Sequence, residues 1–186
     1  MRSILDSPWR ASAVGAVLTV ALVVLAAGSA FDATSATAMT FRALHVLAAM
    51  VWVGLIVFVN FIQLKALKAC ADAERPVIVR HIAGPVAQLF TGAAHATLLT
   101  GVVMLIPIGA AVHQRILLML AVLGGIAMWA IVQFILRPNV ARITGKAAAS
   151  DAEKAIARQA ILTWARVNLV LAIPVSVVML VAAHTG

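Results

Sequence analysis

The chain has 186 residues, of which 64% are hydrophobic and 11% are charged, against roughly 45 to 50% and about 25% in ordinary globular proteins. This composition excludes a soluble domain, and the mean hydropathy of +1.09 indicates an integral membrane protein. The net charge of +8 does not point to nucleic acid, because the basic residues lie between the apolar segments. The single cysteine, Cys70, allows no internal disulfide, and without a CxxCH motif the chain cannot hold haem covalently in the c-type manner.

Five apolar stretches are each long enough to span a bilayer as a helix, and none alternates as an outer-membrane strand would. We therefore predict an all-α, polytopic membrane bundle of five transmembrane helices, with a four-helix core and an additional N-terminal helix. It forms a single domain over residues 1–186. The predicted spans cover residues of about 11–30, 41–64, 82–108, 116–136 and 161–183.

The first stretch, residues 11–30, allows two interpretations. Its length suits a spanning helix, but Arg2 and Arg10 before its core and Gly28-Ser29-Ala30 at its end also resemble a signal peptide with a small-residue cleavage site. The stretch exceeds the roughly 7 to 15 residues of a usual signal-peptide core, which favours the membrane helix. Cleavage would leave four helices with the same orientation.

In the second span, polar and aromatic residues follow helical spacings that place them on one face. Polar residues at membrane depth are costly to expose to lipid and normally face the bundle interior. We expect the inward face of this span to consist of His45, Trp52, Ile56, Asn60 and Gln63.

The three later spans carry comparable stripes, and the glycines in them would let another helix or a flat ligand approach closely. We expect these residues to face inward: His81, Gly84, Gln88, Gly92, His95 and Leu99 in the third span; Gly124, Gly125, Trp129 and Gln133 in the fourth; Trp164, Arg166, Asn168 and Ser176 in the fifth. The Ala-rich residues 146–158 are expected to extend a helix beyond the membrane.

Of the 14 Lys and Arg residues, only Arg42 and Arg115 lie on one side of the predicted spans; all others lie on the opposite side, Arg166 just inside the fifth span. The positive-inside rule therefore predicts that the N-terminus and both basic loops are cytoplasmic and that the C-terminus is outside. We expect a multi-pass protein of the bacterial inner (cytoplasmic) membrane.

Histidines at or near membrane depth are candidate metal ligands, because neutral imidazole is a usual axial ligand of haem iron. His45 lies about one turn inside the outer surface, His95 lies near the middle of the membrane, and His184 ends the last span. Two of them, on separate helices, would hold a b-type haem, with His45 as one ligand and His184 or His95 as the other. Trp52, on the same predicted face as His45, is a further candidate cofactor contact.

Arg42 and Arg115 are candidate partners of the haem propionates, because a guanidinium group pairs bidentately with a carboxylate. Each candidate also has a plainer structural interpretation. The histidines would then be interhelical hydrogen-bond partners, with His184 a solvated terminus and Trp52 a packing residue. The two arginines would simply extend to lipid phosphates.

Three stretches of the chain resemble the N-terminal membrane domain of the urate oxidase family. FRALHVLAAMVWVGLIVFVNFIQLKAL, residues 41–67, has its histidine, W-x-G and N-F-x-Q-like ending. The run from Phe90 through ATLLTG to Gly101 is similar to its third-span signature, and WARVNLVLAIPVSVVMLVAAH, residues 164–184, has its R-x-N, proline, methionine and closing histidine. Weaker similarity extends to the HemJ-type protoporphyrinogen oxidases and to the copper-resistance D membrane family.

This resemblance implies a haem b-binding membrane redox protein in which His45 and His184 are the matching histidines, whereas His95 has no expected counterpart. Family members that act on urate can carry an additional cytochrome c domain. We therefore expect the redox partner here to be another polypeptide, such as a cytochrome c or a catalytic subunit, or a quinone.

The leading hypothesis is an electron-transfer membrane protein with haem b near the outer face. One alternative is an oxidoreductase acting on urate or a porphyrinogen, in which histidines would accept the protons because no carboxylate lies inside a predicted span. Another is copper handling, because thioethers and imidazoles suit Cu(I), although methionine also fills irregular packing. The methionines of the outer half are Met39, Met104, Met119 and Met179.

Overall fold

The computed structural model describes residues 7–27, 33–107, 109 and 115–184. The chain divides into two compact units, Met1–Thr40 and Phe41–Gly186. Every regular element among the described residues is helical, so the predicted all-α fold class is confirmed.

The first unit contains α1 (Pro8–Ala27) and the beginning of α2 (Ala33–Phe58). Pro8 opens α1, at a position where the missing proline N–H costs no hydrogen bond. The described apolar part of α1, Pro8–Leu22, is too short on its own to be recognised as a span, so a fifth transmembrane helix stays a prediction. The small-residue motif at residues 28–30 lies outside the described residues.

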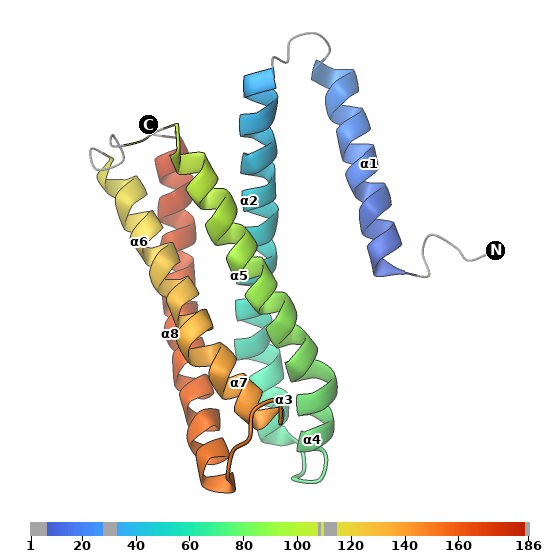
Figure 1. Ribbon diagram of the computed structural model, residues 1–186, viewed down its shortest axis with the longest axis vertical. Helices are drawn as coiled ribbons and strands as arrows, with labels where there is room; N and C mark the ends of the chain where they lie inside the picture. Colours follow the sequence, from blue (N-terminus) through green and yellow to red (C-terminus); the bar gives the residue numbers. More distant parts are fainter. Residues whose placement is uncertain (1–6, 28–32, 108, 110–114, 185–186) are drawn as a thin grey trace, which may run out of the picture. The chain divides into compact units, whose positions relative to one another are not determined.

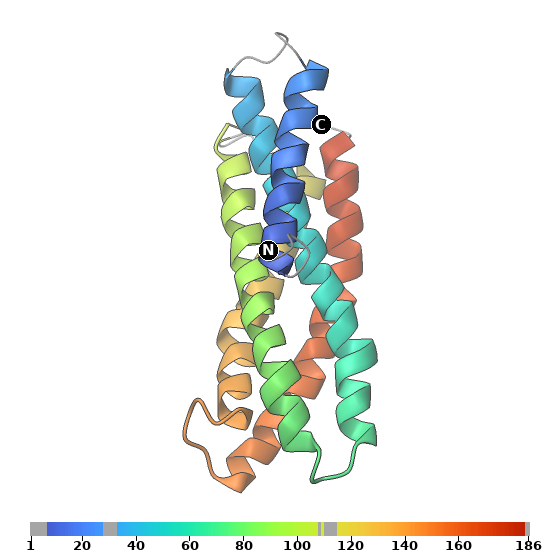
Figure 2. The same cartoon turned by 90° about the vertical axis from the view of Figure 1, so that its right-hand side faces the viewer.

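Among the described residues, four helices are long and apolar enough to cross a membrane. In the second unit they run side by side, and successive helices point in opposite directions (Figures 1 and 2). Three of them contain a π-helical stretch. In chain order the helices are α2 with η3 (Val59–Gln63) and α3 (Leu64–Ala69); α4 (Arg75–Ile78) with η4 (Val79–Ala83) and α5 (Gly84–Leu105); α6 (Ile116–Ala130) with η6 (Ile131–Leu136) and α7 (Arg137–Ile143); and α8 (Asp151–His184).

The two ends of this unit differ in charge. At one end lie the connections 70–74 and 144–150, and we call it the basic end because most of the Lys and Arg residues gather there. At the other end, which we call the His184 end, α5 and α8 finish and α6 begins. The charge difference agrees with the predicted topology, and the orientation itself stays a prediction.

Two of the three π-helical stretches have a local cause, since each directly precedes a proline near the start of the next helix. η4 precedes Gly84-Pro85, and η6 precedes Arg137-Pro138. A proline ring inside an α-helix clashes with the carbonyl four residues earlier, and a wider turn moves that carbonyl away. Accordingly, the amide of Gly84 donates to the carbonyl of Val79, five residues back.

The core of the second unit combines large side chains with alanines. Alanines of α5 and α8 let the helices approach closely, as small residues do in membrane bundles, where burial of apolar surface gives little drive to associate. Large apolar side chains such as Phe134 (68% exposed) and Val170 (70% exposed) instead cover the outside, which supports contact with lipid. The core consists of Trp52, Ile56, Phe90, Ala93, Ala94, Met128, Val132 and Ala172.

The predicted inward face of the second span is confirmed, because all five of its residues are buried or half-buried. The stripe predicted for the third span is wrong in part: α5 turns Ala93, Ala94 and Thr97 inward instead. Alanine is both small and apolar, so it packs closely against another helix at less cost than glutamine. The residues predicted to face inward but found exposed are His81, Gln88, Gly92 and Leu99 in the third span and Arg166 and Ser176 in the fifth.

The predicted helical extension beyond the membrane is confirmed from Asp151, where α8 begins. The backbone N–H and the hydroxyl of Ser150 both donate to Oε2 of Glu153, at 2.7 Å, and the Glu153 amide donates to the Ser150 hydroxyl at 3.3 Å. These reciprocal bonds form a capping box, which satisfies amides that the first turn of a helix leaves without partners.

This capping box makes the start of α8 sensitive to acid. The Ser150 N–H and hydroxyl lower the pKa of Glu153 from its ordinary value of 4.5. A carboxyl group with a lowered folded pKa stabilises the helix start above its ordinary pKa, and this contribution is lost as the pH falls through the folded value. After correction for intrinsic rates, hydrogen exchange of the first-turn amides should be several-fold faster near pH 3 than near pH 6. Glu153→Gln should abolish the difference, and an unchanged pH dependence in that variant would contradict the assignment.

Helices α6 and α8 are in closest contact at Gly124. A Cβ added there would overlap Cγ2 of Val175, whereas a Cβ on the neighbouring Gly125 would have nothing within 4 Å. We expect Gly124→Ala to destabilise the protein by about 1 to 3 kcal/mol through overpacking, and Gly125→Ala to have little effect. Thermal unfolding of the purified protein in detergent measures both, and Val175→Ala should restore the stability of Gly124→Ala. Equal effects of the two glycine substitutions would show that this contact is not close.

Candidate functional site

His45 joins α2 to α5 through its imidazole. Its Nδ1 atom lies 2.9 Å from the carbonyl oxygen of Thr97 and 3.1 Å from the hydroxyl of Thr100. A carbonyl only accepts, so Nδ1 carries the hydrogen and, in the neutral ring, Nε2 keeps its lone pair. Metal-binding histidines are commonly held in this way, with one nitrogen donating to a carbonyl and the other on the metal.

Gly101 provides the space for the His45 ring. A Cβ at this glycine would lie 3.0 Å from Cε1 and 3.3 Å from Nδ1 of His45. Thr97, Thr100 and Gly101 therefore form a seat for the imidazole on one face of α5. All three residues lie in the stretch ATLLTG, residues 96–101, which is part of the run similar to the third-span family signature, but no contact with His45 was predicted for them. Their i, i+3, i+4 spacing places them on one helix face.

His95 lies on a different side of α5. Its Nδ1 donates to the Thr91 carbonyl of its own helix at 2.7 Å, and its ring meets Trp129 of α6 edge to face, with centroids 5.9 Å apart. His95 and Thr97 are two residues apart, so they point to nearly opposite sides of the helix. The structure therefore does not bring His45 and His95 together around one ligand, and it does not support pairing them on a single haem.

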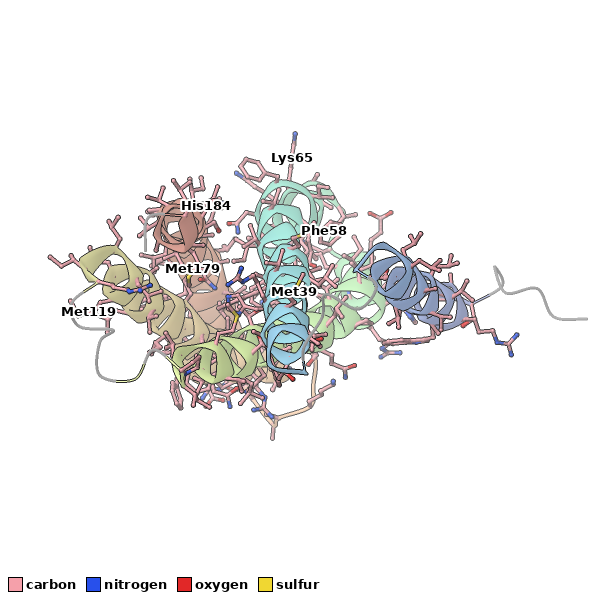
Figure 3. The ribbon with its side chains drawn as sticks, turned by 90° about the horizontal axis from the view of Figure 1, so that it is seen from above. Met39, Phe58, Lys65, Met119, Met179 and His184 are labelled. Atoms are coloured by element: carbon pink, nitrogen blue, oxygen red, sulfur yellow. The ribbon has the colours of Figure 1, made fainter. Side chains whose placement is uncertain are left out.

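His184 lies exposed at the end of α8, and its Nδ1 donates to the carbonyl of Leu180 at 2.8 Å. Figure 3, which looks along the helices, shows His184 on α8 and Met179 on the side of α8 that faces the other helices of the unit. Like His45 and His95, His184 thus uses Nδ1 for a carbonyl and leaves Nε2 available. A neutral imidazole binds a haem iron through one nitrogen. A free Nε2 beside a hydrogen-bonded Nδ1 fits this requirement.

The other predicted cofactor contacts differ in their surroundings. Arg42 lies one turn from His45 and is exposed, as is Arg115 before α6, and neither forms an ion pair with the residues that the structure describes. Trp52 is buried in the core, which is what its packing interpretation requires. Within the described ranges, no three or more His, Cys, Asp or Glu side chains gather to hold a bare metal ion.

Several polar side-chain atoms of the second unit are buried without a hydrogen-bond partner among the described residues. Asn168 is only 1% exposed, yet neither polar atom of its side chain has a hydrogen-bond partner among the described residues. Buried polar atoms are costly without partners, and in proteins they are normally paired with another group, water or a ligand. The atoms in this state are Trp52 Nε1, Asn60 Oδ1, Gln63 Oε1, Trp129 Nε1, Gln133 Oε1 and both Oδ1 and Nδ2 of Asn168.

Asn60 accounts for part of this polar interior. Its Nδ2 donates to the Ile56 carbonyl at 2.9 Å and, across the bundle, to the Ala165 carbonyl of α8 at 3.1 Å. It lies in η3, the π-helical stretch that no proline explains. The interior of the bundle is therefore more polar than packing alone requires, as the sequence predicted for the second span.

A scan against models of protein families, a search of curated proteins and a search of solved structures each find no match to this chain. The resemblance to the urate oxidase membrane domain therefore stays a prediction.

The seat of His45 can be tested without any cofactor. Nitrogen NMR of labelled histidine in the membrane-embedded protein should report the Nδ1–H tautomer for His45. Gly101→Ala should disturb this signal, because the added Cβ would approach the ring to 3.0 Å. Gly92→Ala is the matched control on the same helix, since nothing lies within 4 Å of its Cβ. A signal that Gly101→Ala leaves unchanged would mean that the ring does not rest on α5.

Proposed function

We propose that this chain is a haem b-binding membrane redox protein that transfers electrons, with His45 as one axial ligand of the haem iron. The observation that carries the proposal is the hydrogen bond from His45 Nδ1 to the Thr97 carbonyl, 2.9 Å long, between two helices. It fixes the ring plane and leaves Nε2 free to bind a metal.

Haem b supplies reversible one-electron transfer at its iron when it is bound. The task of the protein is to hold the iron and to tune it. His45 would bind through Nε2, while the Thr97 carbonyl makes the imidazole more basic and keeps it in one orientation. Arg42, one turn away, and Arg115 are the cations available to pair with the propionates at the otherwise cation-poor His184 end.

His184 is the second ligand that we favour. His95 faces the α6 side of α5, away from His45. His184 belongs to a third helix, α8, and lies at the end of the unit toward which Arg42 and His45 also lie. It is also the histidine that the family resemblance carries over together with His45.

Electron transfer is favoured over oxidation of urate or a porphyrinogen by the position of the carboxylates. The acidic residues that the structure describes all lie at the basic end and are exposed: Asp72, Glu74, Asp151 and Glu153. An oxidase that removes protons from its substrate would need a base near His45, and among the residues that the structure describes only imidazole is available there. We therefore propose an electron carrier that works with a cytochrome c, a catalytic subunit or a quinone.

Optical spectra of the purified protein test the proposal. Protein from haem-replete cells should show a Soret band and a reducible α band. His45→Ala should lower the haem content at least about tenfold, because even loss of a supporting hydrogen bond costs metal sites 10- to 100-fold in affinity. His184→Ala should lower it or shift the bands, since an axial ligand sets the spectrum and potential.

Two matched controls accompany these variants. His95→Ala and His81→Ala, the latter exposed at the basic end, should keep the wild-type haem content. A colourless wild type, or full haem in His45→Ala, would refute the proposal. Copper without iron in metal analysis would favour the copper-handling alternative, in which Met179 and the imidazoles would be the ligands.

A further inference from the structure

A second candidate site lies at the basic end, far along α5 from the seat of His45. A groove of about 430 Å³ runs between α5 and α7, within the range of roughly 300 to 1,000 Å³ that ligand sites occupy. Small residues on both helices leave this space open. It is lined by Gly84, Ala87, Gln88, Thr91, Arg137, Val140, Ala141, Thr144 and Lys146.

The groove is positively charged and has no carboxylate in its lining. The two ion pairs among the described residues, Arg75–Asp72 and Lys154–Asp151, lie elsewhere. Arg137 and Lys146 therefore bring two positive charges to the groove without a protein counter-ion from the described ranges.

The hydrogen-bonding groups of the groove are mainly donors. The hydroxyls of Thr91 and Thr144 donate to carbonyls of their own helices, at 2.8 Å each. The donors left for a ligand are the Arg137 guanidinium, the Lys146 ammonium and the amide of Gln88, which is exposed. A ligand that suits this set carries negative charge on several oxygens, as a phosphate group does.

The position of the groove indicates an amphiphile. Arg137 directly follows the apolar stretch 116–136, so it lies at the boundary of the apolar layer, whereas Thr91 lies inside the apolar part of α5. An apolar side chain on the α7 side of the groove is exposed: Phe134, three residues before Arg137, is 68% exposed. A soluble anion would contact only the charged end of the groove. It would make no contact with the part near Thr91 or with the exposed apolar surface beside it.

We propose that the groove between α5 and α7 binds the phosphate headgroup of an anionic glycerophospholipid. Arg137 and Lys146 hold the phosphate, Gln88 bonds the glycerol or ester oxygens, and the acyl chains lie along Phe134. Basic pockets between transmembrane helices are suited to anionic headgroups. The lipid would also join α5 to α7 where the small side chains leave the groove open between these helices, and it would thereby stabilise the bundle.

Lipid titration of the full chain, purified in an uncharged detergent, tests this proposal. Dioleoyl phosphatidylglycerol should bind with saturation in native mass spectrometry and should raise the thermal unfolding temperature. Arg137→Gln and Lys146→Gln should each weaken binding about fivefold, as expected for the loss of one cation near lipid phosphates. Ala141→Leu, which fills the groove without changing the charge, should weaken binding at least as much.

The controls separate the site from general charge and from soluble phosphate. Arg158→Gln removes an exposed cation of α8 that does not line the groove, so it should leave binding unchanged. Dioleoyl phosphatidylcholine, with the same chains and no net charge, should bind more weakly. Equal loss in Arg158→Gln, equal binding of the two lipids, or displacement by millimolar inorganic phosphate alone would overturn the proposal.

Discussion

The structure depends on one constraint: a polar group inside the bilayer must find its partner within the protein. Two bonds across the bundle meet this constraint directly. His45 of α2 donates to the Thr97 carbonyl of α5, and Asn60 of η3 donates to the Ala165 carbonyl of α8. Both join α2 and its continuation to other helices through a backbone carbonyl. Such bonds give the helices a register that apolar packing alone would not define, because lipid tails are as apolar as the helix surfaces.

The same constraint explains why the polar interior is a candidate site rather than simply a core. A backbone carbonyl can accept a hydrogen bond from a side chain of another helix. The Thr97 carbonyl holds the His45 ring in this way through Nδ1 and does not occupy Nε2. Both polar atoms of the Asn168 side chain are buried and have no hydrogen-bond partner among the described residues. A bundle that needed only packing would place leucine or alanine at such positions, since each polar atom without a partner costs free energy.

The sequence predicted the helices and the inward face of the second span, because apolar length and helical spacing are local properties. It did not predict the inward face of α5. Gly92 and Gln88 had the right spacing for an inward stripe, yet Ala93, Ala94 and Thr97 pack inward. On an alanine-rich helix several faces are small enough to pack, so the choice is made by the partner helices. The separation of His45 from His95 has the same origin, because the rotation of α5 is a property of the whole bundle.

The two ends of the second unit are suited to different chemistry. At the His184 end, cations are few, so Arg42 and Arg115 would act strongly on any charged cofactor edge placed there. At the basic end, cations are many, and two of them line a groove that extends into the apolar layer. The polar interior of η3, η6 and α8 lies between these ends. A lipid that joins α5 to α7 would limit the rotation of α5, and the rotation of α5 decides where Thr97 presents its carbonyl to His45. Helix α5 therefore contributes to both proposed sites, with Gln88 at the groove and the Thr97 carbonyl at His45.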